Sequence, residues 1–228
     1  KAMIVAGDPV SAWQRFYVFF YQAFLENDRW RQYLNGVGTT LVVTFFALLL
    51  GVVLGVLVAV VRTAHDQQRP GHRNPVLGLL NAIMKVYVTV IRGTPMMVQL
   101  LIMGFVIFAS SRDYVTVGAL TLGINSGAYT AEIIRGGLMA VDVGQMEAGR
   151  SLGLNWRQTM MHIIMPQAFR TILPTFTSEF ITLIKETSVA SFIAVVDLQK
   201  ACDNIRNATY NAWVPLLLDD VPKGDGGL

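Results

Sequence analysis

The sequence is short of charged side chains and of cysteine. Only 14% of its 228 residues are Asp, Glu, Lys or Arg, whereas 53% are hydrophobic. Ordinary soluble domains carry about 25% charged residues. The single Cys202 excludes a disulfide within the chain and a cysteine cluster for a metal. The formal net charge of +3 is small and unevenly placed, which argues against nucleic acid as a partner.

Sequence patterns of catalysis are missing as well. His, Cys and carboxylate residues do not cluster at metal-ligand spacing. The sequence has neither a glycine-rich phosphate loop nor a nucleophile elbow. We therefore expect no catalytic residue, no metal and no cofactor bound by this chain itself.

Long apolar stretches are present instead. From Leu34 to Val61 no residue is charged, and a helix of this length, at about 1.5 Å per residue, exceeds the ~30 Å hydrocarbon core of a bilayer. The run predicts a transmembrane helix, because it is too long and too far from the start for a signal-peptide core. Further crossings are predicted at 76–109, 115–137 and 167–196. The motif "IRGTPMM" interrupts the first of these, which is therefore either one kinked helix or two elements.

The loop after the first predicted span indicates the topology. Three arginines lie in residues 62–75, and short basic loops beside a span face the cytoplasm. The N-terminus is then extracytoplasmic, although Arg29 and Arg31 argue mildly against this. One crossing for each later stretch places residues 138–166 in the cytoplasm.

The two ends of the chain do not read as spans. Residues 10–26 are aromatic but contain Gln14, Arg15 and Gln22, which suits a helix lying at the membrane interface. About a dozen apolar residues from 207 onward are too few to cross as a helix, so the last helix is either missing from this chain or replaced by the tail. We therefore expect an all-α integral membrane protein with about five transmembrane helices, four clear and the last truncated or missing. The expected parts are a tail with an interfacial helix at 1–33, a transmembrane domain at 34–218 and a flexible tail at 219–228.

Residues 142–166 form a polar stretch with a helical pattern. Residues 142–145 and 155–158 each match a capping box, with a side-chain acceptor followed three residues later by Gln. Between them, Gly153 suits the left-handed residue that ends a helix, and Pro166 disfavours helix at the residue before it. The sequence predicts a helix, a glycine turn and a second helix that stops before Pro166. We call this helix-turn-helix the elbow.

The elbow resembles the EAA loop of bacterial ABC-importer permeases. That loop reads Glu-Ala-Ala, three residues, Gly, nine residues, Ile, one residue and Leu-Pro. Residues 147–166, "EAGRSLGLNWRQTMMHIIMP", follow it in register, except that Gly149 stands for the second Ala and Met165 for Leu. Stretches such as "RGTPMMVQL", "AYTAEIIRGGLMAV" and "IKETSVASFIAVVDL" are similar to the subfamily that imports polar amino acids. The likeness covers about residues 30–200.

The resemblance implies a transport role with several partners. In that family the elbow sits in a groove of a separate ATPase, present in two copies that bind ATP and Mg, and it carries their motion to the spans by alternating access. A second permease subunit, identical or homologous, completes the pathway in the bacterial inner membrane, among its lipids. An extracytoplasmic binding protein delivers the substrate. The residues implied to couple to the ATPase are Glu147, Ala148, Gly149, Leu152, Gly153, Leu154, Ile163 and Pro166.

Polar side chains recur at helical spacing inside two predicted spans. Because polar groups are costly in lipid, such a face normally lines the bundle interior or a water-filled path. The alternative is that these groups pair with each other and hold the helices together. The candidate path residues are Asn125, Tyr129, Glu132, Ser178, Glu179, Thr182 and Lys185. A stripe of small residues suited to close helix packing runs beside the first face; it comprises Ala119, Gly123, Gly127 and Ala131.

Two other functions remain as alternatives to an importer subunit. An ion-coupled secondary carrier would bind its coupling ion at Glu132 and Glu179, but the span count is low and no inverted repeat is evident. A membrane enzyme is less favoured still, because no nucleophile and base stand at a usable spacing.

Overall fold

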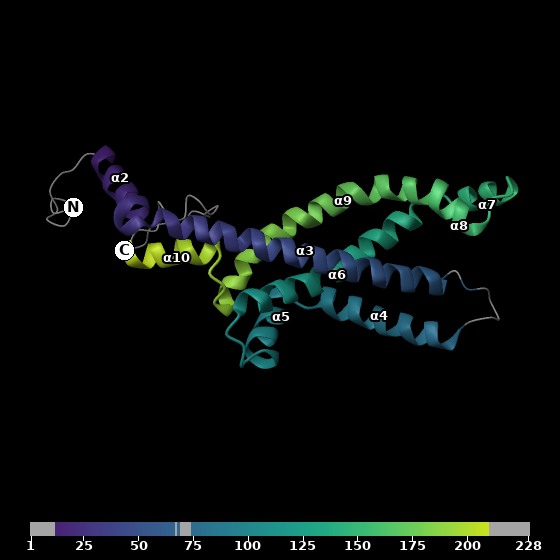
Figure 1. Cartoon of the computed structure of the whole chain (residues 1–228), viewed down its shortest axis with the longest axis horizontal. Coiled ribbons are helices and arrows are strands. Elements are labelled where there is room, and N and C mark those ends of the chain that lie inside the picture. Colours follow the sequence, from purple (N-terminus) through teal and green to yellow (C-terminus); the bar gives the residue numbers. More distant parts are fainter. Residues whose placement is uncertain (1–11, 67, 69–73, 210–228) are drawn as a thin grey trace.

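The computed structural model describes residues 12–66, 68 and 74–209. These ranges contain helices and turns but no strand, which confirms the all-α prediction. Figure 1 shows α3, α4, α6 and α9 along the long axis, with α7 and α8 at one end and α2 and α10 at the other. The elements are α2 (Ala12–Phe20), η1 (Tyr21–Leu25), η2 (Glu26–Asp28), α3 (Trp30–Asp66), α4 (Pro75–Gly93), α5 (Met96–Ile102), η3 (Met103–Ile107), α6 (Tyr114–Met139), α7 (Gly144–Ser151), α8 (Trp156–Thr159), η4 (Met160–Ile164), α9 (Met165–Glu186), η5 (Thr187–Ile193) and α10 (Leu198–Thr209).

Among the described residues, four helices have the length of a membrane span. In the described part, α3 and α4 are both long and apolar enough to cross a bilayer. Helix α3 has 37 residues, more than the predicted 34–61. Helices α6 and α9 have 26 and 22 residues, which meets the requirement of about 20 residues for a crossing, but their polar side chains make them less apolar.

The stretch 76–109 forms two elements, which settles the alternative left open by its sequence. Helix α4 ends at Gly93, and α5 begins after Pro95. Proline has no backbone N–H and favours extended backbone at the residue before it, and Thr94 is extended, with φ −115° and ψ 143°. The Gln99 side-chain amide donates to the carbonyls of Ile91 at 2.7 Å and Thr94 at 3.1 Å. Two of the carbonyls at the break are thereby satisfied.

Helices α3 and α6 pack closely through small residues. A Cβ on Gly55 would stand 2.5 Å from Thr130 Cγ2, and one on Gly127 would stand 2.9 Å from Leu54 Cβ. Carbon atoms pack at about 3.5–4.0 Å, so neither position has room for a methyl group. The predicted small-residue stripe is confirmed as a packing surface on α6, and Gly55 belongs to a matching surface on α3.

One apolar cluster joins the spans in the half of the molecule away from the elbow. It contains buried residues from five elements, which include Val43 of α3, Leu100 of α5, Leu122 of α6, Leu183 of α9 and Ile193 of η5. Each of these side chains is at most 1% exposed. The broken segment α5 and the short turn η5 therefore belong to the core of the bundle.

Helix α6 begins at a side-chain cap. The Asp113 carboxylate accepts from the Thr116 backbone N–H at 3.1 Å and from the Thr116 hydroxyl at 2.5 Å. Both hydrogen bonds hold the pKa of Asp113 below its usual range, and the bond from the hydroxyl has the larger effect. The cap satisfies a backbone N–H at the start of the helix.

The close contact of α3 with α6 predicts opposite effects of one substitution at two glycines. Gly55→Ala should destabilise the protein by about 1–3 kcal/mol, because the added methyl overpacks a fully enclosed site. Gly38→Ala, in the same helix with nothing within 4 Å of its added Cβ, should be neutral or stabilise by up to about 1 kcal/mol. Thermal unfolding of both variants in detergent checks this. Equal melting temperatures for the two variants would contradict the packing argument.

Candidate functional site

The elbow ends its first helix with a glycine in the left-handed conformation. Gly153 has φ +82°, as the sequence predicted. The N–H of Leu154 donates to the carbonyl of Gly149 at 3.1 Å, and the N–H of Gly153 donates to that of Arg150 at 3.0 Å. This pair of bonds is the Schellman motif, which satisfies the last carbonyls of the helix.

Only the second of the two predicted capping boxes forms. Asn155 accepts from the Gln158 N–H at 3.0 Å, and the Gln158 side chain accepts from the Asn155 N–H at 2.9 Å. The prediction for Asp142 was wrong. Its carboxylate accepts from the N–H of Gly144, two residues on, at 2.6 Å, and the Gln145 side chain instead accepts from the Gln167 amide at 3.2 Å. Because Gly144 lies two residues after Asp142, the Asp142 carboxylate forms a short turn with it in place of the capping box.

The second helix of the elbow does not stop before Pro166, which corrects the prediction. Helix α8 continues through the π-turn η4 into α9, and Pro166 is the second residue of α9. Met165 is helical, with φ −59° and ψ −43°. The widened π-turn precedes the proline, where the helix loses a backbone donor. The elbow is therefore joined to α9 without an interruption.

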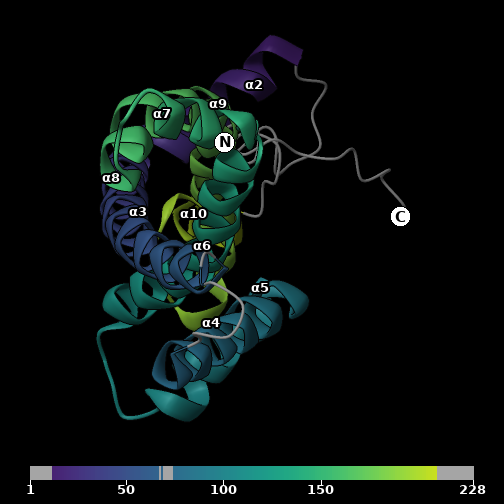
Figure 2. The same cartoon turned by 90° about the vertical axis from the view of Figure 1, so that its right-hand side faces the viewer.

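The elbow presents some of its predicted coupling residues outward and uses others internally. Leu152 is 80% exposed, and Glu147, Ala148, Gly153 and Pro166 are also exposed. Figure 2 shows α7 and α8 beside α9 and away from α4. The inward or half-buried members are Gly149, Leu154 and Ile163.

Gly149 has a packing reason to differ from the alanine of the family pattern. A Cβ at this position would stand 2.5 Å from Thr159 Cγ2, on the other arm of the elbow. Thr159 is itself completely buried. The two arms therefore touch where Gly149 meets Thr159.

Two hydrogen bonds tie α6 to its neighbours around the predicted path. The Asn125 amide donates to Gln99 Oε1 of α5 at 3.0 Å, and the Ser126 hydroxyl donates to Glu179 Oε1 of α9 at 3.2 Å. Asn125 is buried and Glu179 is half-buried. The structure thus brings predicted path residues of two helices to one region, with Gln99 and Ser126 added.

Arginines hold the next two path residues. The Arg92 guanidinium lies 5.1 Å from the centre of the Tyr129 ring and 3.9 Å from the Glu132 carboxylate. Glu132 also accepts from Arg62 of α3. A carboxylate between two guanidinium groups is well compensated, so Glu132 joins three helices where the sequence suggested a path residue or helix-holding pair.

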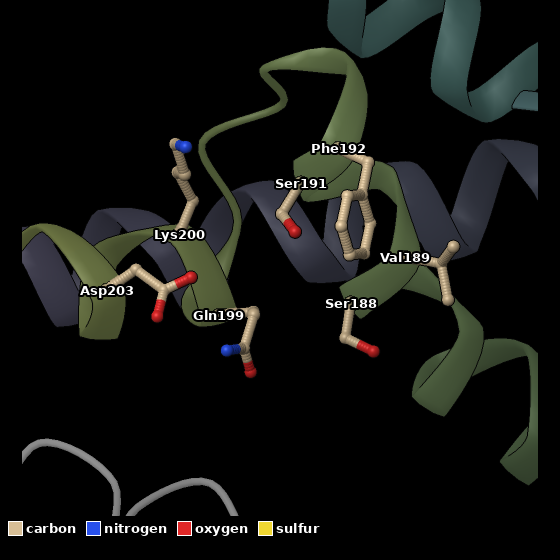
Figure 3. Close-up of a pocket in the computed structure, with 7 residues that line it drawn as sticks. All are labelled: Ser188, Val189, Ser191, Phe192, Gln199, Lys200 and Asp203. Atoms are coloured by element: carbon tan, nitrogen blue, oxygen red, sulfur yellow. The ribbon is translucent and has the colours of Figure 1, made fainter. Parts of the chain in front are cut away.

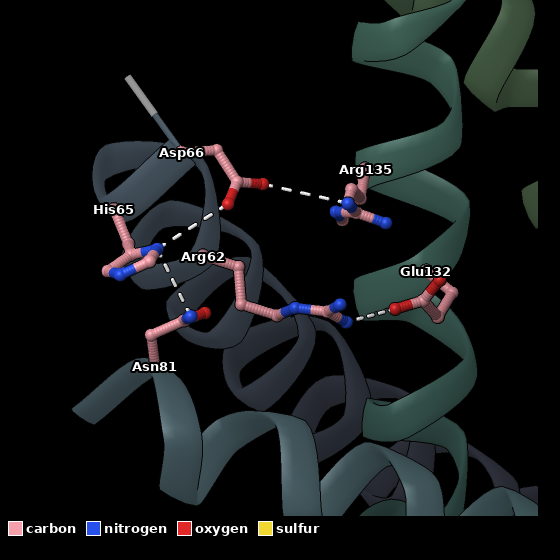
Figure 4. A network of polar contacts seen from close by, with 6 residues as sticks. All are labelled: Arg62, His65, Asp66, Asn81, Glu132 and Arg135. Carbon is pink, nitrogen blue, oxygen red and sulfur yellow. Dashed lines mark hydrogen bonds and ion pairs between the residues drawn. The ribbon is translucent and has the colours of Figure 1, made fainter. Parts of the chain in front are cut away.

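A network of charged and polar groups lies beside Glu132 (Figure 4). Arg135 of α6 pairs with Asp66 of α3 at 3.6 Å. His65 lies 3.1 Å from the Asn81 amide of α4 and 3.5 Å from Asp66. Together with the Arg62–Glu132 pair, these contacts connect α3, α4 and α6. We call this set the three-helix network.

The remaining path candidates lie on the outside of this chain. Ser178, Thr182 and Lys185 of α9 are exposed, and the two hydroxyls donate to backbone carbonyls four residues back, at 3.2 and 3.0 Å. The structure does not bring them to Asn125 and Tyr129. The predicted path is therefore divided between an interior group and an outward face of α9.

Sequence reasoning missed Arg62, Arg92, Gln99 and Ser126. A signal exists for two of them, because Arg92 and Gln99 are polar residues in the apolar stretch 76–109, and polar or ionisable residues within a membrane usually mark a function. Ser126 is one residue away from the stripe that was selected. Arg62 was taken only as a sign of topology.

A pocket lies at the end of the molecule opposite the elbow. Its volume of about 370 Å³ falls in the range of ligand sites, about 300–1,000 Å³. Figure 3 shows side chains from η5 and α10 around it. The Asp203 carboxylate is paired with Arg206 at 2.9 Å. The lining residues are Ser188, Val189, Ser191, Phe192, Gln199, Lys200 and Asp203.

Comparison with known proteins identifies the relatives of this chain. It is 34% identical over 187 residues to a protein named "Putative glutamine transport system permease protein GlnP" of Rickettsia bellii, with 81% of each chain covered. It is 34% identical over 183 residues to "L-cystine transport system permease protein TcyB" of Bacillus subtilis, with 79% of this chain and 74% of that protein covered.

A solved structure and a protein family agree with these relatives. The structure titled "Crystal structure of an amino acid ABC transporter with histidines" matches with a TM-score of 0.71 and 37% identity, over 82% of this chain and 84% of that chain. Residues 76–217 match the family described as "Binding-protein-dependent transport system inner membrane component". The chain therefore belongs to the inner membrane components of binding-protein-dependent transport systems, the permease subunits of ABC importers.

Proposed function

We propose that this permease subunit imports polar amino acids and forms half of their pathway through the inner membrane. The observation that carries the proposal is the elbow, an outward-facing helix pair joined directly to the span α9. The names of the relatives, which include glutamine and cystine permeases, support the substrate class.

The proposed assembly contains three kinds of protein partner and the lipid of the membrane. Two copies of an ABC ATPase bind ATP and Mg and carry the catalytic sites, whereas this chain carries none. A second permease subunit, identical or homologous, completes the pathway. A binding protein delivers substrate to the extracytoplasmic end, where the pocket between η5 and α10 lies. The N-terminus is extracytoplasmic, lipid surrounds the spans, and nucleic acid has no part.

In the proposed coupling step, the elbow follows the ATPase and moves α9. Exposed Leu152 gives the ATPase an apolar anchor, and exposed Glu147 gives it a charge. The Gly149–Thr159 contact keeps the two arms of the elbow together. Because α8, η4 and α9 form one continuous helical segment, a displacement of the elbow reaches the span. The three-helix network holds α3, α4 and α6 together, and α9 moves relative to these three helices.

The proposed substrate path uses both groups of polar residues. The outward face of α9, with Ser178, Thr182 and Lys185, is costly against lipid and suits the interface with the second permease subunit. Glu179 lies between that face and the interior group. A zwitterionic amino acid has an ammonium for Glu179 and a carboxylate for Lys185, which supports an amino acid as the substrate.

An ion-coupled secondary carrier is disfavoured by the family of the chain. Uptake by reconstituted vesicles separates the two functions. Import of a polar amino acid should require ATP, the ATPase and the binding protein. Uptake driven by an ion gradient in the absence of ATP would overturn the importer proposal.

The anchoring role of the elbow predicts a loss of partner binding from one charge. Leu152→Glu should weaken ATPase association by at least about tenfold, as for a central apolar anchor, without lowering the melting temperature. Val196→Glu is the matched control, since Val196 is 52% exposed at the other end of the molecule. Co-purification of the ATPase measures both. Full retention with Leu152→Glu would mean that the elbow does not dock there.

The path predicts different defects for two carboxylates. Glu179→Gln should lower the uptake rate by about tenfold through loss of a charged hydrogen bond to substrate, with stability retained. Glu132→Gln should lower stability by about 1–3 kcal/mol, because Arg62, 13% exposed, loses its ionised partner. Uptake assays and thermal unfolding of both variants distinguish the roles. Unchanged uptake with Glu179→Gln removes that residue from the path.

A further inference from the structure

The outward side of α2 and η1 is aromatic. Trp13, Phe16, Tyr17, Phe20 and Tyr21 recur at positions i, i+3, i+4, i+7 and i+8, which form one stripe on a helix. Their exposed fractions lie between 40% and 80%. We call these five residues the aromatic stripe. An exposed apolar surface of this kind marks contact with a partner or a membrane.

The opposite side of the same segment is already used for packing. Ala23 is 1% exposed and Tyr33 of α3 is 6% exposed, in a cluster with Cys202 and Ile205 of α10. The Phe24 ring stacks on Tyr33 with centroids 5.1 Å apart. The inner side therefore attaches α2 and η1 to α3 and α10, and the stripe faces away from the chain.

The length of α3 places the stripe at a membrane surface. The uncharged run from Leu34 to Val61 contains 28 residues, about 42 Å of helix, which matches a bilayer of about 40–45 Å with its headgroup regions. The segment before this run therefore stands at the boundary with water. In both views α2 lies crosswise to α3 (Figures 1 and 2).

Charges mark the same boundary. Arg31 pairs with Asp28 at 3.9 Å, and both side chains are about two-thirds exposed, at 66% and 65%. The Arg31 guanidinium lies 5.4 Å from the centre of the Trp30 ring. An arginine beside a tryptophan suits the zone between headgroups and water.

We propose that the aromatic stripe lies in the headgroup region of the bilayer and anchors the N-terminal segment to the membrane surface. Trp and Tyr concentrate at this depth because their rings are apolar at one end and polar at the other. Helix α3 also carries exposed apolar side chains, which include Leu34, 60% exposed, and Phe45, 62% exposed. Through the cluster that Ala23 and Tyr33 form with Cys202 and Ile205, the anchor holds α10 at a constant depth.

The proposal is independent of the transported substrate. The proposed topology decides only in which leaflet the stripe lies, and it places the stripe in the extracytoplasmic one. Fluorescence of single tryptophans tests it in the permease reconstituted in liposomes without the ATPase, which leaves the elbow open to water. The chain contains Trp13, Trp30, Trp156 and Trp213, so phenylalanine at the other three leaves Trp13 alone. A tryptophan-free variant carrying Phe45→Trp serves as the deep control. A variant that retains only Trp156, in the elbow, serves as the aqueous control.

Brominated phospholipids and aqueous iodide then report the depth of each ring. We expect bromine near the headgroup to quench Trp13 about twofold more than bromine deep in the acyl chain, with the reverse order for Phe45→Trp. Trp156 should respond to iodide alone. Quenching of Trp13 by iodide without lipid quenching would place the stripe in water and overturn the proposal. Protection from both quenchers would also overturn it, because a protein partner then covers the stripe. Amino-acid uptake is measured separately, so a failure of either proposal is recognised by itself.

Discussion

The close approach of α3 and α6 is the contact on which the rest of the bundle depends. Glycine at positions 55 and 127 lets the two helices meet where a methyl group would collide with Thr130 or Leu54. In a membrane, helices gain little from burying apolar surface, so van der Waals contact at short range supplies much of their association. Around this pair, the broken segment α5, the turn η5 and α9 complete one apolar cluster.

This arrangement separates holding groups from groups available for transport. Glu132 lies among Arg62 and Arg92, and its carboxylate is occupied by helix contacts. Glu179, by contrast, accepts a hydrogen bond from the Ser126 hydroxyl and stands beside the exposed face of α9. In the sequence, both carboxylates lie among polar residues inside predicted spans, but in the structure their surroundings differ. Their roles in a permease follow from those surroundings.

Sequence reasoning succeeded where a local rule decides the backbone. The Schellman turn at Gly153 and the capping box at Asn155 depend on residues within five positions, and both were predicted. It failed at Pro166, where a local preference against helix was outweighed by the π-turn and the continuation into α9. It also failed at Asp142, where two local solutions competed and the pattern did not rank them.

The sequence by itself determined the helical class, the presence of the first span, the glycine-ended elbow and the resemblance that led to the permease family, because each depends on composition or on short spacing. The tertiary structure alone decided which polar residues meet. Arg62 and Glu132 are 70 positions apart, and Ser126 and Glu179 are 53 apart, so no periodicity within one helix relates them. Packing of α3, α6 and α9 brings these groups together, and it leaves Ser178, Thr182 and Lys185 facing outward.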